Sequence, residues 1–294
     1  MEDYQIERVH ENGLRFYQVT QDEKVIAKLP SVTTVLGNTK DMSGLDKWRK
    51  KVGEEEADRI VTLSMNRGTI MHRLIELYKE TKGEATDRLV ELKKVAKEDE
   101  ETNQFKDEEL GELFLTEAWK FFYKFYYNSA DYFDRVKKVL EAEKFLWTTK
   151  GGGWAGTVDN ISELVDNKIV IIDYKNSRKP KQEHWIQDYF IQTSAYFIAY
   201  WDRTGIKADG AEIWIANELD NLPQTFTLTQ KDLDKIKEDF KEYQKSLYNL
   251  DSAFNMMSKD SGNLESETKE DLIKRDYEEI PYRFIKSKLY GTGE

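Results

Sequence analysis

The chain has 294 residues, a length that fits either two domains or one large α/β domain with insertions. Its 45 basic and 56 acidic residues give a formal net charge of −11, and 13% of the residues are aromatic, which excludes wholesale disorder. The absence of cysteine excludes disulfide frameworks, thiolate zinc sites, iron-sulfur clusters and a cysteine nucleophile, so a metal ion here must bind to oxygen and imidazole.

No apolar run in the sequence approaches the roughly 20 residues that a membrane-spanning helix needs. The polar start Met1-Glu2-Asp3 does not have the pattern of a signal peptide. We therefore expect an intracellular protein without a membrane partner.

Residues 4–19 alternate apolar and polar side chains on both sides of Asn12-Gly13, a dipeptide that favours a tight turn. This pattern predicts a β-hairpin. Residues 31–36 form a short segment rich in β-branched side chains, and this pattern predicts a further strand. Residues 1–40 are thus assigned to an N-terminal β-hairpin and strand.

From residue 45 to about residue 135, apolar residues recur at steps of three and four, which predicts mostly helix. Within this stretch, residues 84–112 carry 11 acidic and 5 basic side chains. Such a charge density favours a solvated, mobile insertion over a packed element. We assign residues 41–138 to a helical block and residues 84–112 to an acidic insertion within it.

The composition changes near Val139, where strand patterns replace the helical ones. The next segments predict three strands, a helix and two more strands, over residues 140–147, 154–165, 168–174, 182–204, 211–216 and 224–228. Thr229 then caps a helix whose apolar stripe extends to Leu250. We assign residues 139–257 to one core and the mostly polar residues 258–294 to a C-terminal extension.

Two acidic motifs lie on the second and third of these predicted strands. The first, Gly-x-x-Asp, ends at Asp159, and the second, Asp-x-Lys, begins 14 residues later at Asp173. Asp173 and Lys175 share a face because they are two residues apart on one strand. The short turn at residues 166–167 makes the two strands antiparallel neighbours and brings Asp159 opposite a position near Lys175, so two carboxylates and one ammonium converge.

Such a trio suits phosphodiester hydrolysis. Carboxylates are hard oxygen ligands for Mg²⁺ or Mn²⁺, which polarises the phosphate and lowers the pKa of a bound water. The lysine can orient that water or offset the charge that grows on the phosphate. The alternative is an ordinary solvent-facing ion pair at a strand end, which is the commoner meaning of an isolated Asp-x-Lys.

Two helical motifs accompany the acidic ones. His72 lies on a predicted helix with Glu76 at i+4, and its imidazole is a natural extra metal ligand; the alternative is a half-buried histidine bonded to Glu76. Gln192 and Tyr196 lie four residues apart on the helix after the Asp-x-Lys strand and project from one side. They can hold a phosphate or a base; alternatively, Tyr196 belongs to the core.

Four motifs therefore occur in one order: Gly-x-x-x-His at 68–72, Gly-x-x-Asp at 156–159, Asp-Tyr-Lys at 173–175 and Gln-x-x-x-Tyr at 192–196. In order and spacing they resemble the PD-(D/E)xK nuclease superfamily, and more narrowly its RecB-type exonuclease branch. Residues 30–33, 48–49 and 173–181 are especially similar to phage exonucleases and the mitochondrial genome maintenance exonuclease. The resemblance implies a restriction-endonuclease-like α/β fold, with a mixed central sheet flanked by helices, an N-terminal hairpin and a large helical insertion that forms one wall of the active-site cleft.

The resemblance also implies roles for individual residues. His72, Asp159 and Asp173 would bind Mg²⁺ or Mn²⁺, with the carbonyl of Tyr174 as a further ligand, and Lys175 would be the catalytic lysine. Two glutamates, Glu141 and Glu143, compete for a further acidic position, and we choose neither. The sequence departs from the family pattern in having Val158 in place of the proline and Asn176 where threonine is frequent.

A basic groove in an acidic protein is the arrangement we expect for the substrate. Phosphate neutralisation dominates nucleic-acid affinity, so local charge matters more than the net charge. The alternative is that these basic residues are scattered over the surface. The candidates for nucleic-acid binding are Gln192, Tyr196, Ser177, Arg178, Lys179, Lys181 and Arg67.

A dinucleotide-binding reading of the glycine-rich segment 151–156 is rejected. Its glycines match G-x-G-x-x-G, but they lead into a predicted strand and not into the helix N-terminus that would receive a pyrophosphate. We therefore expect no nucleotide cofactor, and the missing cysteines exclude an iron-sulfur cluster.

These features predict a metal-dependent DNA exonuclease that acts on single-stranded ends in DNA replication, recombination or repair, with proteins of those processes as partners. The expected location is the cytoplasm of a bacterium or of a phage-infected host, and a phage gene is one expected source of the chain. Two alternatives remain: a structure-specific or site-specific endonuclease of the same superfamily, and a non-catalytic nucleic-acid-binding module of that fold.

Overall fold

A computed structural model describes residues 4–11, 14–39, 43–150 and 153–233 of the chain. The N-terminal elements are β1 (Gln5–Glu11), β2 (Leu14–Gln21), β3 (Lys24–Pro30), α1 (Val32–Thr39) and α2 (Ser43–Val52). The helical region contains α3 (Glu54–Glu80), α4 (Ala85–Glu98), α5 (Gly111–Tyr126), η1 (Ser129–Asp131) and η2 (Phe133–Arg135). The remaining elements are β4 (Val136–Thr148), β5 (Trp154–Leu164), β6 (Ile169–Ser177), η4 (Glu183–Trp185), α6 (Gln187–Thr204), β7 (Gly210–Asn217) and β8 (Gln224–Thr229).

The central sheet is mixed, as the sequence predicts. Its strand order is β4-β5-β6-β7-β8, and only the β6–β7 pair is parallel. Parallel neighbours need a long crossover, and α6 supplies it between β6 and β7. The predicted fold class, a mixed α/β sheet flanked by helices, is confirmed.

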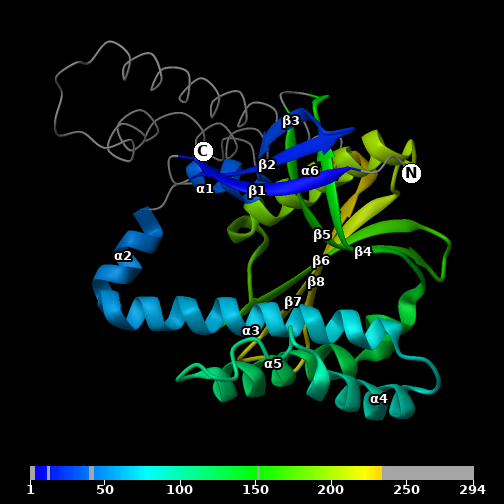
Figure 1. The fold of residues 1–294 in the computed structure, drawn as a ribbon. Coiled ribbons are helices and arrows are strands. Elements are labelled where there is room, and N and C mark those ends of the chain that lie inside the picture. Colours follow the sequence, from blue (N-terminus) through cyan, green and yellow to red (C-terminus); the bar gives the residue numbers. More distant parts are fainter. Residues whose placement is uncertain (1–3, 12–13, 40–42, 151–152, 234–294) are drawn as a thin grey trace, which may run out of the picture.

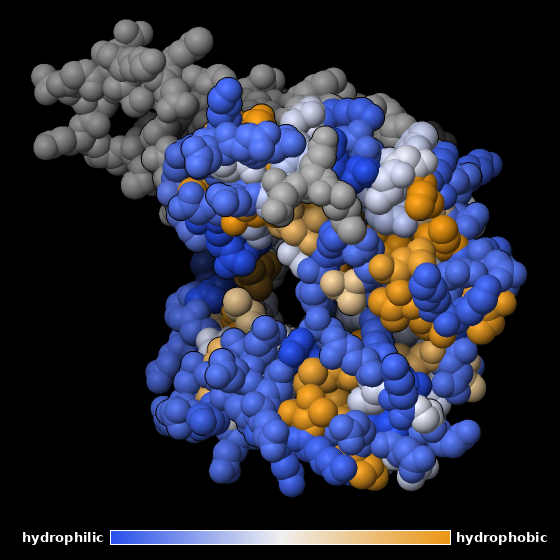
Figure 2. Space-filling model, turned by 45° about the vertical axis from the view of Figure 1, so that its right-hand side comes forward, coloured by the Kyte–Doolittle hydropathy of each residue, from blue (hydrophilic) through white to orange (hydrophobic). Residues whose placement is uncertain are grey.

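Helices cover both faces of this sheet, and β6 shows how the sequence directs them. Ile171 packs in the core that contains residues of α1 and α6, whereas its neighbour Ile172 packs in the core that contains residues of α3, α4 and α5. Successive side chains of a strand point to opposite faces, so an apolar run such as Val170 to Ile172 requires cover on both sides. Figure 1 shows α3, α4 and α5 together on one side of the sheet, and in Figure 2 an opening separates the part of the surface with these helices from the part with the N-terminal strands.

The N-terminal region differs in part from the prediction. The two hairpin strands form β1 and β2, although Asn12-Gly13 lies outside the described residues, and β3 adds a third strand that was not predicted. The predicted strand over residues 31–36 is wrong, because α1 begins at Val32. Ser31 Oγ accepts a hydrogen bond of 2.9 Å from the N–H of Thr34, and this N-cap outweighs the β propensity of the branched side chains.

The acidic segment 84–112 also differs from the prediction of a mobile insertion. Its helix α4 packs against α3, and Leu92 and Ala96 are buried in the same core as α5. The charged residues occupy the solvent side of an amphipathic helix, so a high charge density coexists with a packed inner face.

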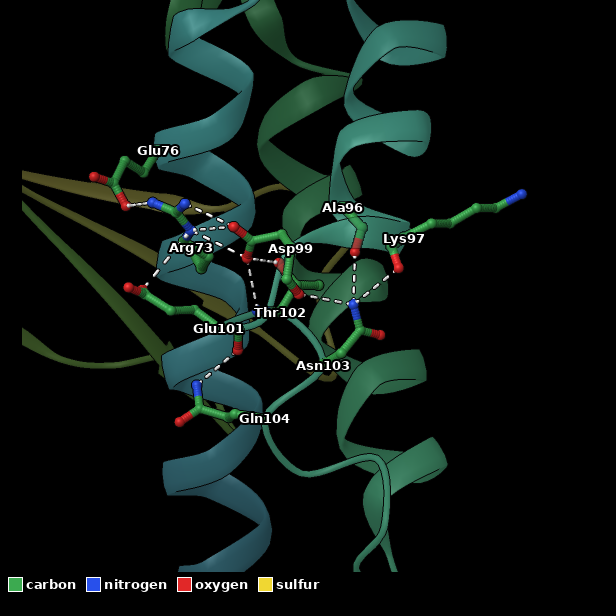
Figure 3. Close-up of polar contacts among 9 residues, drawn as sticks. All are labelled: Arg73, Glu76, Ala96, Lys97, Asp99, Glu101, Thr102, Asn103 and Gln104. Atoms are coloured by element: carbon green, nitrogen blue, oxygen red, sulfur yellow. Dashed lines mark hydrogen bonds and ion pairs between the residues drawn. The ribbon is translucent and has the colours of Figure 1, made fainter.

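A polar network joins the end of α4 to the middle of α3 (Figure 3). Asp99 Oδ1 accepts a 2.7 Å hydrogen bond from Arg73 Nη2, and its Oδ2 accepts hydrogen bonds of 2.7 and 2.8 Å from the N–H and the hydroxyl of Thr102. Arg73 also donates to Glu76 Oε2 at 2.6 Å. Hydrogen bonding to the Arg73 guanidinium holds the pKa of Asp99 at about 2, well below its ordinary value.

The described part of the chain ends four residues into the predicted C-terminal helix. Thr229 and Asp232 form reciprocal hydrogen bonds at its start, with Thr229 N donating to Asp232 Oδ2 at 2.9 Å. The remainder of that predicted helix and the C-terminal extension lie outside the described residues. Among the helices that the structure describes, none is long and apolar enough to cross a membrane.

The Arg73–Asp99 contact predicts an acid-dependent contribution to stability. Asp99→Asn should lower the free energy of unfolding at pH 7 by about 1–3 kcal/mol, the usual value of hydrogen bonds to a charged group. Because the folded-state pKa of Asp99 is lowered to about 2, this contribution is present above the unfolded pKa near 3.8 and is lost as the pH falls towards 2. Urea unfolding at pH 7, 4 and 3 should therefore show a difference from wild type that narrows with acid. Glu101→Gln is the control, since Glu101 is 70% exposed and lies 3.7 Å from Arg73; a pH-independent difference for Asp99→Asn would contradict the prediction.

Candidate active site

The candidate site forms where β5 and β6 separate. Their ladder ends at the Asn160–Ile172 pair. One residue beyond it, Asp159 Oδ2 accepts a hydrogen bond of 2.8 Å from the backbone N–H of Tyr174. The carboxylate of Asp159 therefore lies in the gap between the two strands, where its side chain is 11% exposed.

The register of this hairpin differs slightly from the predicted one. From the sequence we expected Asp159 opposite a position near Lys175, whereas the observed register, continued by one residue, places it opposite Asp173. The reason is that the pairing is centred on Asp166 and not between residues 166 and 167. The two aspartates still converge, and the charge of Asp159 contributes to raising the pKa of Asp173.

Asp173 and Lys175 form a buried ion pair on one face of β6. Lys175 Nζ lies 2.5 Å from Asp173 Oδ2, and the side chain of Asp173 is 2% exposed. Burial raises the pKa of Asp173, with Lys175 opposing the rise. Burial also works against the charge of Lys175, but the carboxylates of Asp173 and Asp159 outweigh it and raise the pKa of the ammonium above its ordinary value. The predicted shared face is confirmed, and Asp173 Oδ1 has no hydrogen-bond partner within the described part of the chain.

His72 reaches the same place from α3. Its Nε2 lies 2.8 Å from the carbonyl oxygen of Tyr174; since a carbonyl only accepts, Nε2 carries the proton. The lone pair is then on Nδ1, which lies 3.7 Å from Asp159 Oδ2 and 4.0 Å from Glu143 Oε1. Burial lowers the pKa of His72, so the imidazole is in the neutral form that metals bind. Its predicted alternative partner, Glu76, accepts from Arg73 instead.

Glu143 is the acidic residue that the sequence analysis did not choose. It has a φ of +44°, in the left-handed region, and it lies within β4 between Ala142 and Lys144, which pair with Asn160 and Val158 of β5. The register of these two pairs places Glu143 opposite Asp159, and its Oε1 lies 4.0 Å from His72 Nδ1. Burial, the charge of Asp159 and the charge of Glu76 raise the pKa of Glu143 to about 8.

The sequence carries no signal that favours Glu143 over Glu141. Glu141 and Glu143 are two residues apart, so regular alternation puts both on one face of β4. Glu141 instead lies 3.5 Å from Lys144 Nζ. Only the backbone conformation at Glu143 distinguishes the two.

Three side chains can hold a metal ion together. His72, Glu143 and Asp159 each offer a ligand atom, and these atoms all lie within 4.8 Å of one another. Two carboxylates and a neutral imidazole suit a divalent cation, and the charge of Asp159 adds to the burial that raises the pKa of Glu143. Of the predicted ligands, His72 and Asp159 belong to this group, while Asp173 lies 2.5 Å from Lys175 and the carbonyl of Tyr174 is engaged by His72.

Two motif glycines allow close approaches beside these groups. A Cβ at Gly68 would lie 2.6 Å from Asn176 Nδ2, so a larger residue there would displace the Asn176 amide from its present position. A Cβ at Gly156 would lie 3.0 Å from the hydroxyl of Tyr196, which is 4% exposed. Gln192 Nε2 lies 3.4 Å from the same hydroxyl. Tyr196 and Gln192 are thus next to the Gly-x-x-Asp strand, with Tyr196 buried.

A cleft of about 600 Å³ lies between α2, α3, the end of β6 and the start of α6. Four of the predicted nucleic-acid-binding residues line it, namely Arg67, Ser177, Arg178 and Lys181. Lys179 is exposed and lies outside the lining. Further lining residues include Trp48, Ser64, Asn176, Tyr189 and Glu218, none of which the sequence analysis proposed for binding.

Comparisons with known proteins bear on this arrangement. The family model for the PD-(D/E)XK nuclease superfamily matches residues 34–266. Two solved structures are similar: a Eubacterium rectale protein named "Putative exonuclease", at 15% identity over 57% of this chain and 70% of that chain with a TM-score of 0.32, and a protein named SSO0001, at 16% identity over 58% and 82% with a TM-score of 0.28. No curated protein matches the chain.

The three-ligand group predicts a metal-dependent gain in thermal stability. Ligand binding stabilises a folded protein by RT ln(1 + [L]/Kd), which is about 2.7 kcal/mol at 100 times Kd. Glu143→Gln should weaken Mn²⁺ binding at least about tenfold, which removes about 1.4 kcal/mol of that gain. Glu141→Gln is the matched control and should respond to Mn²⁺ as wild type does. Thermal unfolding with and without Mn²⁺ measures both, and an equal loss in the two variants would reject Glu143 as a ligand.

Proposed function

Because the chain belongs to the PD-(D/E)XK nuclease superfamily, we propose that it is a metal-dependent deoxyribonuclease that removes nucleotides from single-stranded DNA ends. One observation carries the proposal. The ligand atoms of His72, Glu143 and Asp159 lie within 4.8 Å of one another, next to the buried Lys175–Asp173 pair. The charges of Lys175 and Asp159 shift the pKa of Asp173, and the charges of both aspartates raise the pKa of Lys175. This mutual influence supports a single reaction centre.

The proposed metal ligands are His72, Glu143 and Asp159, with Asp173 Oδ1 as a further oxygen. When bound, Mg²⁺ or Mn²⁺ polarises the scissile phosphate and lowers the pKa of a coordinated water. Burial raises the pKa of Glu143 to about 8, so this carboxyl would hold a proton at neutral pH, and a cation held by these residues would favour its ionised form.

Lys175 is the proposed catalytic lysine. Its raised pKa keeps the ammonium protonated at neutral pH, so it acts as a hydrogen-bond donor and a positive charge and not as a general base. Its partner Asp173 fixes its position at 2.5 Å. From there the ammonium can donate to a phosphate oxygen or to the attacking water, and it offsets the negative charge that grows in the transition state.

The finer assignments follow from the motif order and the lining of the cleft. We propose that the protein is of the RecB-type exonuclease branch, similar to phage exonucleases, and that it acts in replication, recombination or repair. The basic residues Arg67, Arg178 and Lys181 of the cleft support a nucleic-acid substrate. The aromatic side chains of Trp48 and Tyr189, which also line the cleft, support a single strand over a duplex.

The role of Lys175 predicts a clean separation of binding from cleavage. Lys175→Ala should reduce cleavage of an end-labelled strand by a factor of about 10²–10³, because a hydrogen-bond donor that stabilises the transition-state charge is lost. Mn²⁺-dependent thermal stabilisation and DNA binding should survive. Lys94→Ala, on the exposed face of α4, is the control. Cleavage by Lys175→Ala at the wild-type rate would reject the assignment.

The requirement for a free end separates an exonuclease from an endonuclease. Linear end-labelled single strands should be degraded in Mg²⁺ or Mn²⁺ and left intact in EDTA. A circular single strand of the same sequence should stay intact under all conditions. Cleavage of the circle would favour the endonuclease, and inactivity on both with retained DNA binding would favour a non-catalytic module.

A further inference from the structure

The cleft beside the candidate active site has the features of a built nucleotide subsite. We infer that it binds one nucleotide of a single DNA strand, with the guanidinium of Arg67 on a backbone phosphate and the base against the ring of Trp48. The inference deepens the proposed function, on which it rests, because the ligand is a part of the proposed substrate.

Arg67 carries the argument, because it is buried and incompletely bonded. Arg67 is 2% exposed. Its Nε donates to Asn176 Oδ1 at 2.9 Å, and its Nη1 donates to Glu218 Oε1 at 2.6 Å. The guanidinium also stacks over Phe121, with its carbon 4.5 Å from the ring centroid. Its Nη2 has no hydrogen-bond partner among the residues that the structure describes. A buried donor without a partner is costly, and a phosphate oxygen in the cleft would satisfy it.

The position of the cleft fits a strand that continues from the reaction centre. Asn176 and Ser177 line it and directly follow Lys175 on β6. Tyr189 lines it as well, and its ring centroid lies 5.3 Å from Lys175 Nζ. A phosphate bound at Arg67 is therefore next to the phosphate at which Lys175 acts.

The charge of the cleft is opposite to that of the whole chain. Four basic side chains and two acidic ones line it: Arg59, Arg67, Arg178, Lys181, Glu56 and Glu218. The carboxylate of Glu56 is engaged by Arg59, with contacts of 2.8 and 2.9 Å. Glu218 lies 2.6 Å from Arg67 and 3.9 Å from Arg178, so it occupies the cations that a phosphate would use. A bound strand must compete with Glu218.

The remaining lining suits a base better than a second phosphate. Trp48 is half-buried on α2, a helix in which no residue is buried, so its indole contributes little to the core. Aromatic rings beside an arginine form the usual platform for unpaired bases, and a volume of about 600 Å³ is in the range of small-ligand sites. A duplex would not present a base to such a cleft.

Binding of a fluorescent single-stranded 20-mer, measured by anisotropy in EDTA so that no cleavage occurs, tests the inference. Trp48→Ala should weaken binding about five- to hundredfold, the loss expected when one base loses its aromatic platform. Arg67→Gln should weaken binding and reduce the slope of log K against log salt by about 0.7, the contribution of one phosphate contact on a single strand. Arg135→Gln, which breaks the buried Arg135–Glu212 pair elsewhere, is the matched control and should leave the slope unchanged.

Glu218→Gln distinguishes a phosphate-binding role of Arg67 from a purely structural role of Arg67. It removes an ion pair of Arg67 and yet should strengthen binding about two- to tenfold, because the phosphate no longer competes with a carboxylate. This variant and Trp48→Ala keep the test decisive if Arg67→Gln does not fold. Unchanged binding in Trp48→Ala, or weaker binding in Glu218→Gln, would overturn the subsite. If the wild type is inactive but the variants show these binding changes, the nuclease proposal is rejected and the subsite is retained. If the wild type is active but the variants do not show these changes, the subsite is rejected and the nuclease proposal is retained.

Discussion

The main chain of Tyr174 holds the candidate site together. Its N–H donates to Asp159 and its carbonyl accepts from His72, so one residue of β6 orients two side chains from two other elements. Both bonds are available because the β5–β6 ladder ends just before this position. The other edge of β6 stays paired with β7, where Tyr174 is opposite Trp214, and this pairing keeps the backbone rigid while one edge is open.

Two lysines near this centre show how local geometry decides protonation. Lys175 lies 2.5 Å from Asp173, and its pKa is raised because the carboxylates outweigh its burial. Lys79 lies over the ring of Tyr174 at 4.5 Å, and burial lowers its pKa to about 7 although Asp159 and Glu143 oppose the shift. The same carboxylates thus keep the Lys175 ammonium charged, whereas the pKa of Lys79 stays close to neutral pH. A divalent cation would change the balance for both.

Much of the sheet and part of the site could be predicted from the sequence. The strands β4 to β8 follow from alternation and turn signals, and the shared face of Asp173 and Lys175 follows from their spacing, because both depend on local periodicity. The helix at residues 32–39 could not be predicted from β-branched composition, since a single cap at Ser31 decides it. The packing of residues 84–112 was hidden as well, because charge counts do not show which face of a helix carries the charge.

The choice of Glu143 was out of reach for a different reason. It depends on a positive φ within a strand, a tertiary effect that leaves no trace in the residue pattern. For the same reason the role of Arg67 could only be refined with coordinates, because burial and an unpaired Nη2 are properties of packing.

The network around Arg73 gives the α4–α5 connection an influence on the site that it does not touch. Arg73 directly follows His72 on α3 and is anchored by Asp99, which in turn is bonded to Thr102. The turn of α3 that carries His72 is thus held in place by contacts with the residues that follow α4. A substitution at Asp99 or Thr102 would therefore change the support of the turn that carries His72, although neither residue belongs to the candidate site.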